Sequence, residues 1–300
     1  IQSMHNRSIL SADIGGSHIT AAAFVERPEG YAMESIATKS IDSRQSKDFI
    51  LKQWVSVFNE LVSDFSHCCI VLAMPAPFDY VNGICQIVDQ GKFIHLLGVD
   101  IKKELSERLG ISTTQIHFVN DAKAFLMGES KFGKVSGFEN ILGLTLGTGL
   151  GSSRKNGEQI FDAELWSSKF KDSIAEDYLG TGWFIAWCKE NLSLEVKGVK
   201  EIIDNPELLQ MAMPAFSTFS KNLAEFILMR FEEIPIDAIV LGGSISRSHA
   251  LFLEETISIF NQHYIHTPVF VSDFGDKSAL FGAASQFFGQ KVLLGLDQES

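Results

Sequence analysis

The sequence contains few cysteines, only four in 300 residues, at positions 68, 69, 85 and 188. None of them forms a Cys-x-x-Cys pair or has paired histidines nearby, so neither a disulfide framework nor a zinc ribbon is indicated. Free cysteine is among the most buried residue types, and we therefore expect buried thiols at these positions.

Long apolar runs are also missing. No stretch approaches the roughly 20 consecutive apolar residues that a membrane-spanning helix requires. The first eight residues lack the hydrophobic segment of a signal peptide. We therefore expect a cytoplasmic protein with no membrane partner.

Basic residues are in the minority, because 25 Lys and Arg stand against 37 Asp and Glu and leave a net charge of −12. Such a field repels phosphate backbones and anionic lipid heads, which excludes nucleic acid and membrane surfaces as expected partners. A small neutral or metal-neutralised ligand is easier to accommodate. With 45% hydrophobic and 21% charged residues, the chain has the composition of a globular protein with a sizeable core.

Short β-type runs alternate with helical periodicity along the chain, which predicts an α/β protein. Helices are expected where apolar residues recur at helical spacing, within 50–65 and 216–227, and Asp100 and Asp276 stand where helix N-caps belong. Several predicted strands end on glycine or a polar residue, where open α/β sheets keep their ligand groups. The predicted strands are 9–13, 19–24, 70–73, 116–119, 141–146, 238–241 and 269–271.

A weak internal repeat links the two halves of the chain. Residues 10–17 and 142–149 each place a polar residue and glycines after a short strand, and a second strand-like run follows. Two similar hairpins indicate a duplicated domain. We expect domains over 1–119 and 120–282 with a cleft between them, and a C-terminal helix over about 283–300 that packs back on the first domain.

The first glycine-rich turn contains Asp13, Gly15, Gly16 and Ser17. Glycines at a hairpin turn allow positive φ and a close approach of backbone N–H groups to an anion, and a carboxylate at a strand end can hold a cation through water. The pattern is typical of a phosphate and magnesium site, and equally of a tight turn with a capping aspartate.

A second glycine-rich turn runs from Thr145 to Gly151 and adds two hydroxyls that can donate to phosphate oxygens. Its G-x-G-x-G spacing is not the dinucleotide-binding fingerprint. Residues 128–134 read G-x-x-x-x-G-K, but Val135 replaces the magnesium-binding Ser or Thr, and the run follows a helix-like segment. This stretch is therefore not a P-loop.

Two further motifs follow predicted strands. Gly242 and Gly243 come after an apolar run, and they either border a nucleotide base or form a bare turn. Asn120 and Asp121 close the strand 116–119 and open a helix, so they are either an N-cap or a pair that binds a hydroxyl group and takes its proton.

These motifs, in this order, resemble those of the superfamily of sugar kinases, actin and heat-shock chaperone ATPases. Within it, the chain resembles the ROK family of bacterial sugar kinases and related repressors. The resemblance covers nearly the whole chain, including residues 73–77, 82–83 and 281–284. It implies two similar domains of the actin-like ATPase (ribonuclease H-like) fold, and ATP-dependent phosphorylation of a hexose or amino-sugar hydroxyl.

The resemblance also implies roles for single residues. Asp13 would position Mg²⁺, Gly242 and Gly243 would border the adenosine, and Asn120 and Asp121 would bind the sugar, with Asp121 as catalytic base. It also makes a homodimer plausible. The residues that would enclose the ATP phosphates are Gly15, Gly16, Ser17, Thr145, Gly147, Thr148 and Gly149.

One segment departs from the family. ROK members usually have a Gly-Glu-x-Gly-His motif and a cysteine cluster that binds zinc together with the histidine. Here Glu164 keeps the sugar-binding glutamate, Ser167 stands at the histidine position, and no cysteine follows until Cys188. Glu176 corresponds to a second sugar-contacting glutamate, in an alignment that crosses a deletion. No structural zinc is expected.

A protein with these motifs could also be a repressor, an assembling ATPase or a non-catalytic sensor. A repressor would carry a DNA-binding domain ahead of the first motif, and only twelve residues precede Asp13. An actin-like assembling ATPase gives no reason for Asn120, Asp121 and Glu164. A non-catalytic sugar sensor of the same fold remains open, because the altered segment around Glu164 and Ser167 could have lost turnover.

Overall fold

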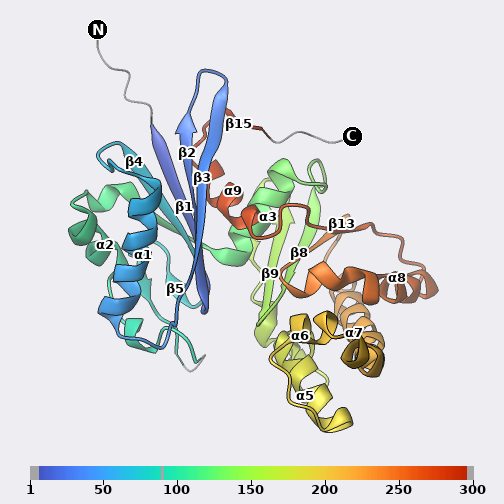
Figure 1. Ribbon diagram of the computed structural model, residues 1–300. Coiled ribbons are helices and arrows are strands. Elements are labelled where there is room, and N and C mark those ends of the chain that lie inside the picture. Colours follow the sequence, from blue (N-terminus) through green and yellow to red (C-terminus); the bar gives the residue numbers. More distant parts are fainter. Residues whose placement is uncertain (1–6, 89–90, 296–300) are drawn as a thin grey trace. The chain divides into compact units, whose positions relative to one another are not determined.

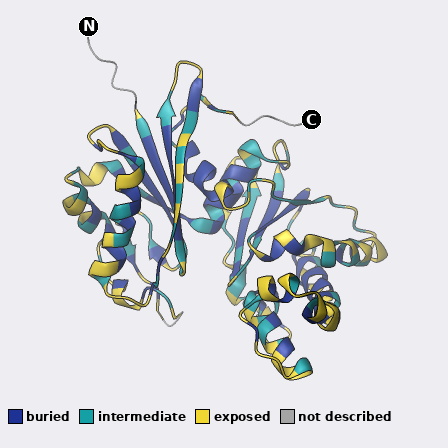
Figure 2. Cartoon of the chain, viewed as in Figure 1, coloured by how far each residue is buried: buried dark blue, intermediate teal, exposed yellow. Residues whose placement is uncertain are grey.

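The computed structural model describes residues 7–88 and 91–295 of the chain (Figure 1). Its contacts group the chain into two compact units. Unit 1 comprises Ile1–Phe132 and Asp276–Ser300, and unit 2 comprises Gly133–Gly275. In each unit the central strands of a mixed sheet are largely buried beneath helices (Figure 2).

The sheet of unit 1 has the strand order β15-β3-β2-β1-β4-β7. Strands β1, β2 and β3 form an antiparallel meander. Strand β4 pairs in parallel with β1, and β7 pairs in parallel with β4. On the other side, β15 pairs in parallel with β3. The strands are β1 (Ser8–Ile14), β2 (His18–Glu26), β3 (Gly30–Ser40), β4 (Cys68–Met74), β7 (Ile116–Asn120) and β15 (Val292–Leu294).

Helices cover both faces of this sheet. Side chains alternate along β1, so Leu10 faces the core beneath α1 (Lys47–Leu61) and α2 (Ile101–Leu109), while Ser11 donates to the Leu280 carbonyl of α9 (Lys277–Ser285) on the other face. The remaining elements of unit 1 are α3 (Asp121–Phe132), the two-residue strands β5 (Phe78–Asp79) and β6 (Ile84–Cys85), and the 3₁₀ turns η1 (Ile94–Leu96) and η2 (Thr113–Gln115).

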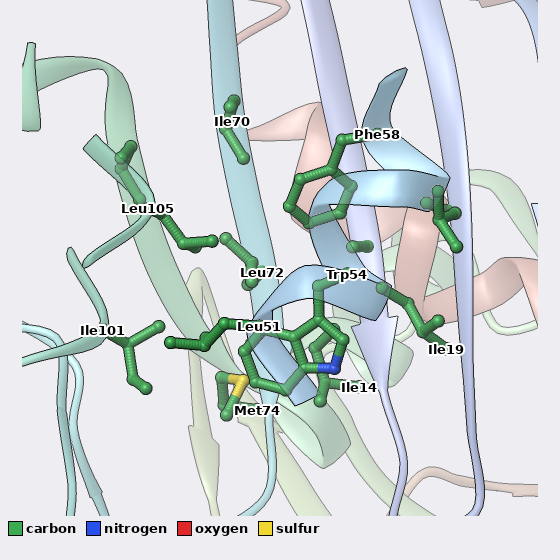
Figure 3. Close-up of a cluster of buried hydrophobic side chains, with 14 of the residues drawn as sticks. Ile14, Ile19, Leu51, Trp54, Phe58, Ile70, Leu72, Met74, Ile101 and Leu105 are labelled. Atoms are coloured by element: carbon green, nitrogen blue, oxygen red, sulfur yellow. The ribbon is translucent and has the colours of Figure 1, made fainter. Parts of the chain in front are cut away.

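Helix α1 shows why its sequence folds as it does. The Ser46 side chain accepts a hydrogen bond from the Phe49 N–H and caps the helix. Leu51, Trp54 and Phe58 repeat at helical spacing and pack on the apolar face of the sheet (Figure 3). The predicted helical stripe within 50–65 is therefore a core face.

Helices α3 and α9 approach each other at two glycines. A Cβ on Gly128 would overlap the Ser278 carbonyl, and one on Gly282 would overlap the Ala124 carbonyl. Beside them, the Ser278 hydroxyl donates to the buried Glu129 carboxylate at 2.5 Å. Only glycine permits so close a helix contact, which ties the C-terminal segment to unit 1.

The sheet of unit 2 has the order β10-β9-β8-β13-β14. Its pairing repeats that of β3-β2-β1-β4-β7, with an antiparallel meander followed by two parallel strands. This repetition supports the duplication inferred from the two hairpins. The strands are β8 (Asn140–Leu146), β9 (Leu150–Asn156), β10 (Gln159–Asp162), β13 (Ala238–Gly242) and β14 (Val269–Val271).

Most helices of unit 2 lie in the sequence between β10 and β13. The longest, α7 (Pro206–Phe231), is capped by Asn205 and buries Phe216 and Phe219 against Phe184 of α5 (Thr181–Leu192). The other elements are η3 (Leu165–Ser167), β11 (Lys169–Phe170), β12 (Ser173–Ile174), α4 (Ala175–Leu179), α6 (Val199–Asp204), η4 (Ile245–Leu251) and α8 (Leu253–Gln262).

Some expectations differ from the structure. The C-terminal helix expected over about 283–300 was wrong in its extent, because α9 ends at Ser285 and residues 292–294 form the edge strand β15; residues 296–300 lie outside the described residues. The compact units also differ from the expected halves, because α3 packs on α9 and groups with unit 1. Cys69 is half-buried, whereas the other three thiols are buried. Within the described residues, no helix is long and apolar enough to cross a membrane.

Candidate active site

Two of the predicted carboxylates lie in unit 1 near the ends of parallel strands. Asp13 is the penultimate residue of β1, and Asn120 ends β7 and is followed by Asp121 at the start of α3. Strand β4 lies between β1 and β7 and runs parallel to both. The carboxyl ends of parallel strands share one edge of a sheet, which is where ligands bind in open α/β sheets.

The first glycine turn connects β1 to β2. The Gly15 N–H donates to the His18 carbonyl at 2.9 Å, and the exposed Ser17 hydroxyl lies 3.2 Å from His18 Nδ1. Neither Gly15 nor Gly16 has a positive φ, so this turn does not use the left-handed backbone that glycine allows. These glycines matter for space, because a Cβ on Gly15 would lie 3.2 Å from the His18 carbonyl oxygen.

Asn120 acts as the helix cap considered in the sequence analysis. Its Oδ1 accepts from the Lys123 N–H at 2.8 Å, and its Nδ2 donates to the Tyr80 hydroxyl at 3.2 Å. The Tyr80 hydroxyl in turn donates to the Met74 carbonyl at the end of β4. This chain of hydrogen bonds fixes the start of α3 and therefore the position of Asp121.

The carboxylates of unit 1 influence one another. The pKa of Asp13 is raised to about 8, first because burial removes water from its carboxylate and then because Asp121 and Asp276 carry like charges. Burial also raises the pKa of Asp121, while the nearby charge of Lys92 and a hydrogen bond from the Ala122 N–H lower it. Two carboxylates with raised pKa values beside a glycine turn are typical of a functional site.

Lys92 is a residue that the sequence analysis missed. A Cβ on Gly16 would lie 3.2 Å from its Cδ and 3.4 Å from its Cβ, so the lysine stem runs beside the first glycine turn. Its charge also acts on Asp121. No sequence motif marks it, because it approaches the turn from a loop far along the chain.

The second glycine turn lies in unit 2 between β8 and β9. The Gly147 N–H donates to the Gly149 carbonyl, and the Gly147 carbonyl accepts from both the N–H and the hydroxyl of Thr181. Thr145 is half-buried at the end of β8, and Thr148 is exposed at the tip of the turn. The α5 N-terminus therefore holds the turn in place and leaves its outer side open.

The two predicted sugar-binding glutamates occupy neighbouring elements of unit 2. Glu176 of α4 accepts from the Leu150 N–H through Oε2 at 2.9 Å, and a Cβ on Gly149 would overlap that carboxylate. Glu164 is exposed with φ of 51° at the start of η3, and η3 packs on α4 and β9. Glu176 therefore supports the second turn, and Glu164 presents its carboxylate to solvent.

Gly242 and Gly243 lie beside that turn. Gly242 pairs with Thr145 across β13 and β8, and a Cβ on Gly147 would lie 3.6 Å from the Ser244 hydroxyl. Gly243 has φ of 84°, and a Cβ there would collide with the Leu146 main chain. Gly243 is thus required by the packing of the two strands, whatever it borders.

A pocket of about 370 Å³ opens beside these glycines. This volume is within the range of small-molecule sites. Sequence reasoning missed most of its polar wall, and Lys134 was considered only as part of a rejected P-loop; Lys134 forms an ion pair with Asp273 at 2.8 Å. The lining residues are Lys134, Gly242, Gly243, Ser246, Arg247, His249, Val271, Ser272, Asp273 and Gly275.

The residues of unit 1 suit a magnesium ion held partly by a substrate. No group of three or more His, Cys, Asp or Glu side chains in the described part of the chain is arranged to hold a metal ion. Mg²⁺ keeps several waters and commonly binds one or two carboxylates together with substrate phosphates. The repulsion that Asp121 and Asp276 exert on Asp13 is one that such an ion would relieve.

Residues 9–161, just over half of the chain, match the ROK family. The chain is 28% identical over 149 residues to a glucokinase of Thermotoga maritima, which is 49% of this chain and 44% of that protein. It is 31% identical over 163 residues to an N-acetyl-D-glucosamine kinase of Mannheimia succiniciproducens, covering 52% of this chain and 47% of that protein. The chain thus matches about half the length of these curated relatives.

A solved structure extends the likeness to the whole fold. The ROK family glucokinase from Streptomyces griseus, crystallised with glucose and AMPPNP, has a TM-score of 0.72 and 20% identity, and the match covers 93% of this chain and 98% of that one. The predicted fold class, the actin-like ATPase fold, is confirmed by this likeness.

Proposed function

Since the chain belongs to the ROK family, we propose that it is a sugar kinase that transfers the γ-phosphoryl group of ATP to a hydroxyl of a hexose or amino sugar. The observation that carries this proposal is the placement of Asp121. Its carboxylate stands at the start of α3, in the electrostatic reach of both Asp13 and Lys92, on the same unit as the first glycine turn.

Asp121 would be the general base. The raised pKa of its carboxyl group makes it a better proton acceptor than an ordinary aspartate, and a base is most effective when its pKa approaches the working pH. The sugar O–H bond breaks and its proton passes to Asp121, while the sugar oxygen forms a bond to the γ-phosphorus. The bond between that phosphorus and the bridging oxygen breaks, and its electron pair leaves with ADP.

Asp13 would hold the magnesium ion of Mg-ATP through water, and the ion would neutralise charge on the phosphates. The amide of Gly16 and the hydroxyl of Ser17 would donate to phosphate oxygens, while Gly15, whose N–H already donates to the His18 carbonyl, would keep the turn free of a side chain so that the phosphates can approach. We extend the same role to the second turn, with Thr145, Gly147, Thr148 and Gly149, since both turns follow the first strand of equivalent sheets.

The pocket beside Gly242 and Gly243 would receive the adenosine. Its lining combines two glycines with polar side chains, among them Arg247 and the ion pair of Lys134 with Asp273, that can hydrogen-bond a nucleoside. Asn120 and Glu164 would contact the sugar, as would the Glu176 oxygen that does not accept from Leu150. Ser167 is exposed and would replace the family histidine with a shorter side chain, so weak sugar affinity is expected. Cytoplasmic location and a homodimer remain predictions.

The alternative is a sensor that binds sugar or nucleotide without turnover. It is favoured by one observation, the altered segment that carries Glu164 and Ser167, where loose positioning of a sugar could cost orders of magnitude in rate.

An ADP-release assay with Mg-ATP and a panel of hexoses, hexosamines and N-acetylated hexosamines distinguishes the two functions. The kinase requires ADP release that a particular sugar stimulates. Nucleotide binding by calorimetry with no stimulation by any sugar would favour the sensor, and an absence of nucleotide binding would contradict both.

A further inference from the structure

Lys92 lies between two parts of the proposed phosphoryl-transfer site of unit 1. Its aliphatic stem runs against Gly16 of the first glycine turn, at the 3.2 and 3.4 Å separations given above. At the other end of the side chain, the positive charge lowers the pKa of Asp121. Any group that lies between the turn amides and the general base therefore lies near this ammonium.

The fold holds Lys92 in this place through its neighbour. Phe93 is fully buried, packs edge-on against Trp54 and adopts a left-handed backbone with φ of 56°. The Phe93 N–H donates to the Ser43 carbonyl at 2.9 Å. Ile41, two residues before Ser43, donates its N–H to the Ser17 carbonyl at 2.8 Å. The same segment thus anchors both the lysine and the glycine turn.

The ammonium acts on Asp121 through its charge and not through a direct bond. No hydrogen bond or ion pair joins it to any residue that the structure describes. Lys92 is half-buried, whereas most lysines in folded proteins are exposed. A lysine whose stem is packed in place and whose ammonium makes no hydrogen bond to a described residue is suited to an anionic ligand.

We propose that Lys92 is a catalytic residue whose ammonium contacts the transferred phosphoryl group as that group passes from ATP to the sugar. This inference rests on the proposed kinase function. In the transfer, charge on the γ-phosphoryl oxygens is stabilised by donors fixed in advance, and Lys92 supplies one of them beside the amide of Gly16. The lysine keeps its three protons throughout, and the sugar proton goes to Asp121.

The test compares Lys92→Met with Lys92→Arg and with the control Lys52→Met, which removes one positive charge from an exposed position of α1. Calorimetry measures the Kd of Mg-AMPPNP and of Mg-ADP for each variant. Because only AMPPNP carries the third phosphate, Lys92→Met should weaken AMPPNP about tenfold, which is typical of losing a hydrogen bond to a charged group. ADP affinity should stay within about twofold, since its two phosphates do not reach the lysine.

Turnover with the sugar that stimulates the wild type provides the second measurement. Lys92→Met should lower kcat about 100-fold, as removal of one donor to a developing charge does elsewhere. Lys92→Arg should restore a large part of this loss, and Lys52→Met should match the wild type. A Lys92→Met variant with unchanged kcat, or one that loses AMPPNP and ADP affinity equally, would overturn the proposal. If the wild type itself shows no sugar-stimulated turnover, it is the kinase function that fails, and the AMPPNP to ADP ratio still decides whether Lys92 meets the third phosphate.

Discussion

Asp13 and Asp121 are chemically identical side chains in different surroundings. Both are partly buried, and both have raised pKa values, but Lys92 acts on Asp121 and counteracts the effect of burial there. Asp13 has Asp121 and Asp276 as neighbours, and like charges raise its pKa further. In the proposed function Asp13, beside two like charges that a cation would relieve, holds the magnesium ion, and Asp121 at the start of α3 accepts the proton.

The role of Asp121 is tested by Asp121→Asn. An amide can still hydrogen-bond a sugar hydroxyl but cannot accept its proton, so we expect turnover to fall roughly 100-fold or more while sugar affinity is largely kept. Steady-state kinetics and calorimetry with the preferred sugar provide the two numbers. Nearly full activity in this variant would show that Asp121 is not the general base and has only a structural role at the start of α3.

The charge on Asp13 should make the metal-free protein less stable as the pH rises. Its folded pKa of about 8 is above the ordinary value of 3.8, so between these values the folded chain holds a proton that the unfolded chain has released. Stability is therefore lost progressively from about pH 4 to pH 8. We expect Asp13→Asn to stabilise the protein little near pH 4 and by up to a few kcal/mol at pH 8 and above.

Urea unfolding in the presence of a chelator, at pH 5 and pH 8.5, measures this difference. The exposed Asp172→Asn is the matched control and should show no such increase with pH. A gain from Asp13→Asn that is equal at both pH values would show that Asp13 does not titrate in this range.

At the scale of elements, the contact of α3 with α9 depends on two glycines. Gly282→Ala would place a methyl group against the Ala124 carbonyl and the Gly128 N–H, and the helices would have to separate. Overpacking of this kind typically costs 1–3 kcal/mol, and we expect a loss of about that size. The contact also positions Asp121, so sugar-stimulated turnover should fall as well.

A matched control exists in α5, where a Cβ on Gly182 would meet nothing within 4 Å. Gly182→Ala should be neutral or stabilising by about 1 kcal/mol, because alanine is the better helix former. Urea unfolding followed by circular dichroism compares the two variants. If Gly282→Ala were as stable as the wild type, the described helix contact would be wrong.

The regular elements were the most predictable part of the fold. Each strand predicted from an apolar run, from residues 9–13 to 269–271, coincides with a strand of the structure, and Asp100 caps α2 as expected by accepting from the Lys103 N–H. Strand β3 was not predicted, because alternate residues along much of its length are exposed and leave no continuous apolar run. The edge strand β15 is three residues long, too short for a pattern.

The candidate site was predictable where its residues adjoin in sequence. The two glycine turns and the pair Asn120 and Asp121 were found because each motif lies at a strand end. Lys92 could not be found this way, because only the fold brings its loop near the first glycine turn. Arg247 follows Gly243 by four residues in η4, but no motif marks it as part of a pocket. The sequence also did not reveal that Gly243 is fixed by the Leu146 main chain.

At the scale of the whole molecule, the chain is a duplicated fold, and the proposed function gives its two units different tasks. Their sheets share five strands in equivalent order and direction, with the first hairpin of each closed by a glycine turn. Unit 1 carries the carboxylates Asp13 and Asp121. Unit 2 carries the pocket beside Gly242 and Gly243 and the two glutamates, so in the proposed function unit 1 supplies the general base and the magnesium site, and unit 2 receives the adenosine and adds contacts to the sugar.

The departure from the family's zinc motif leads to a prediction for the whole protein. With Ser167 at the histidine position and no cysteine cluster, the purified protein should contain no stoichiometric zinc. Elemental analysis after purification without chelators measures this. A value close to one zinc per chain would contradict the prediction and would point to ligands outside this segment.

The most direct test of the central claim follows the phosphoryl group itself. ATP labelled with ¹⁸O in the γ-phosphoryl group is incubated with Mg²⁺ and the panel of sugars, and the products of the wild type and of Asp121→Asn are analysed by mass spectrometry. The account predicts a labelled sugar phosphate from the wild type and at least about 100-fold less of it from the variant. Label recovered only in inorganic phosphate, or in no product with any sugar, would contradict it.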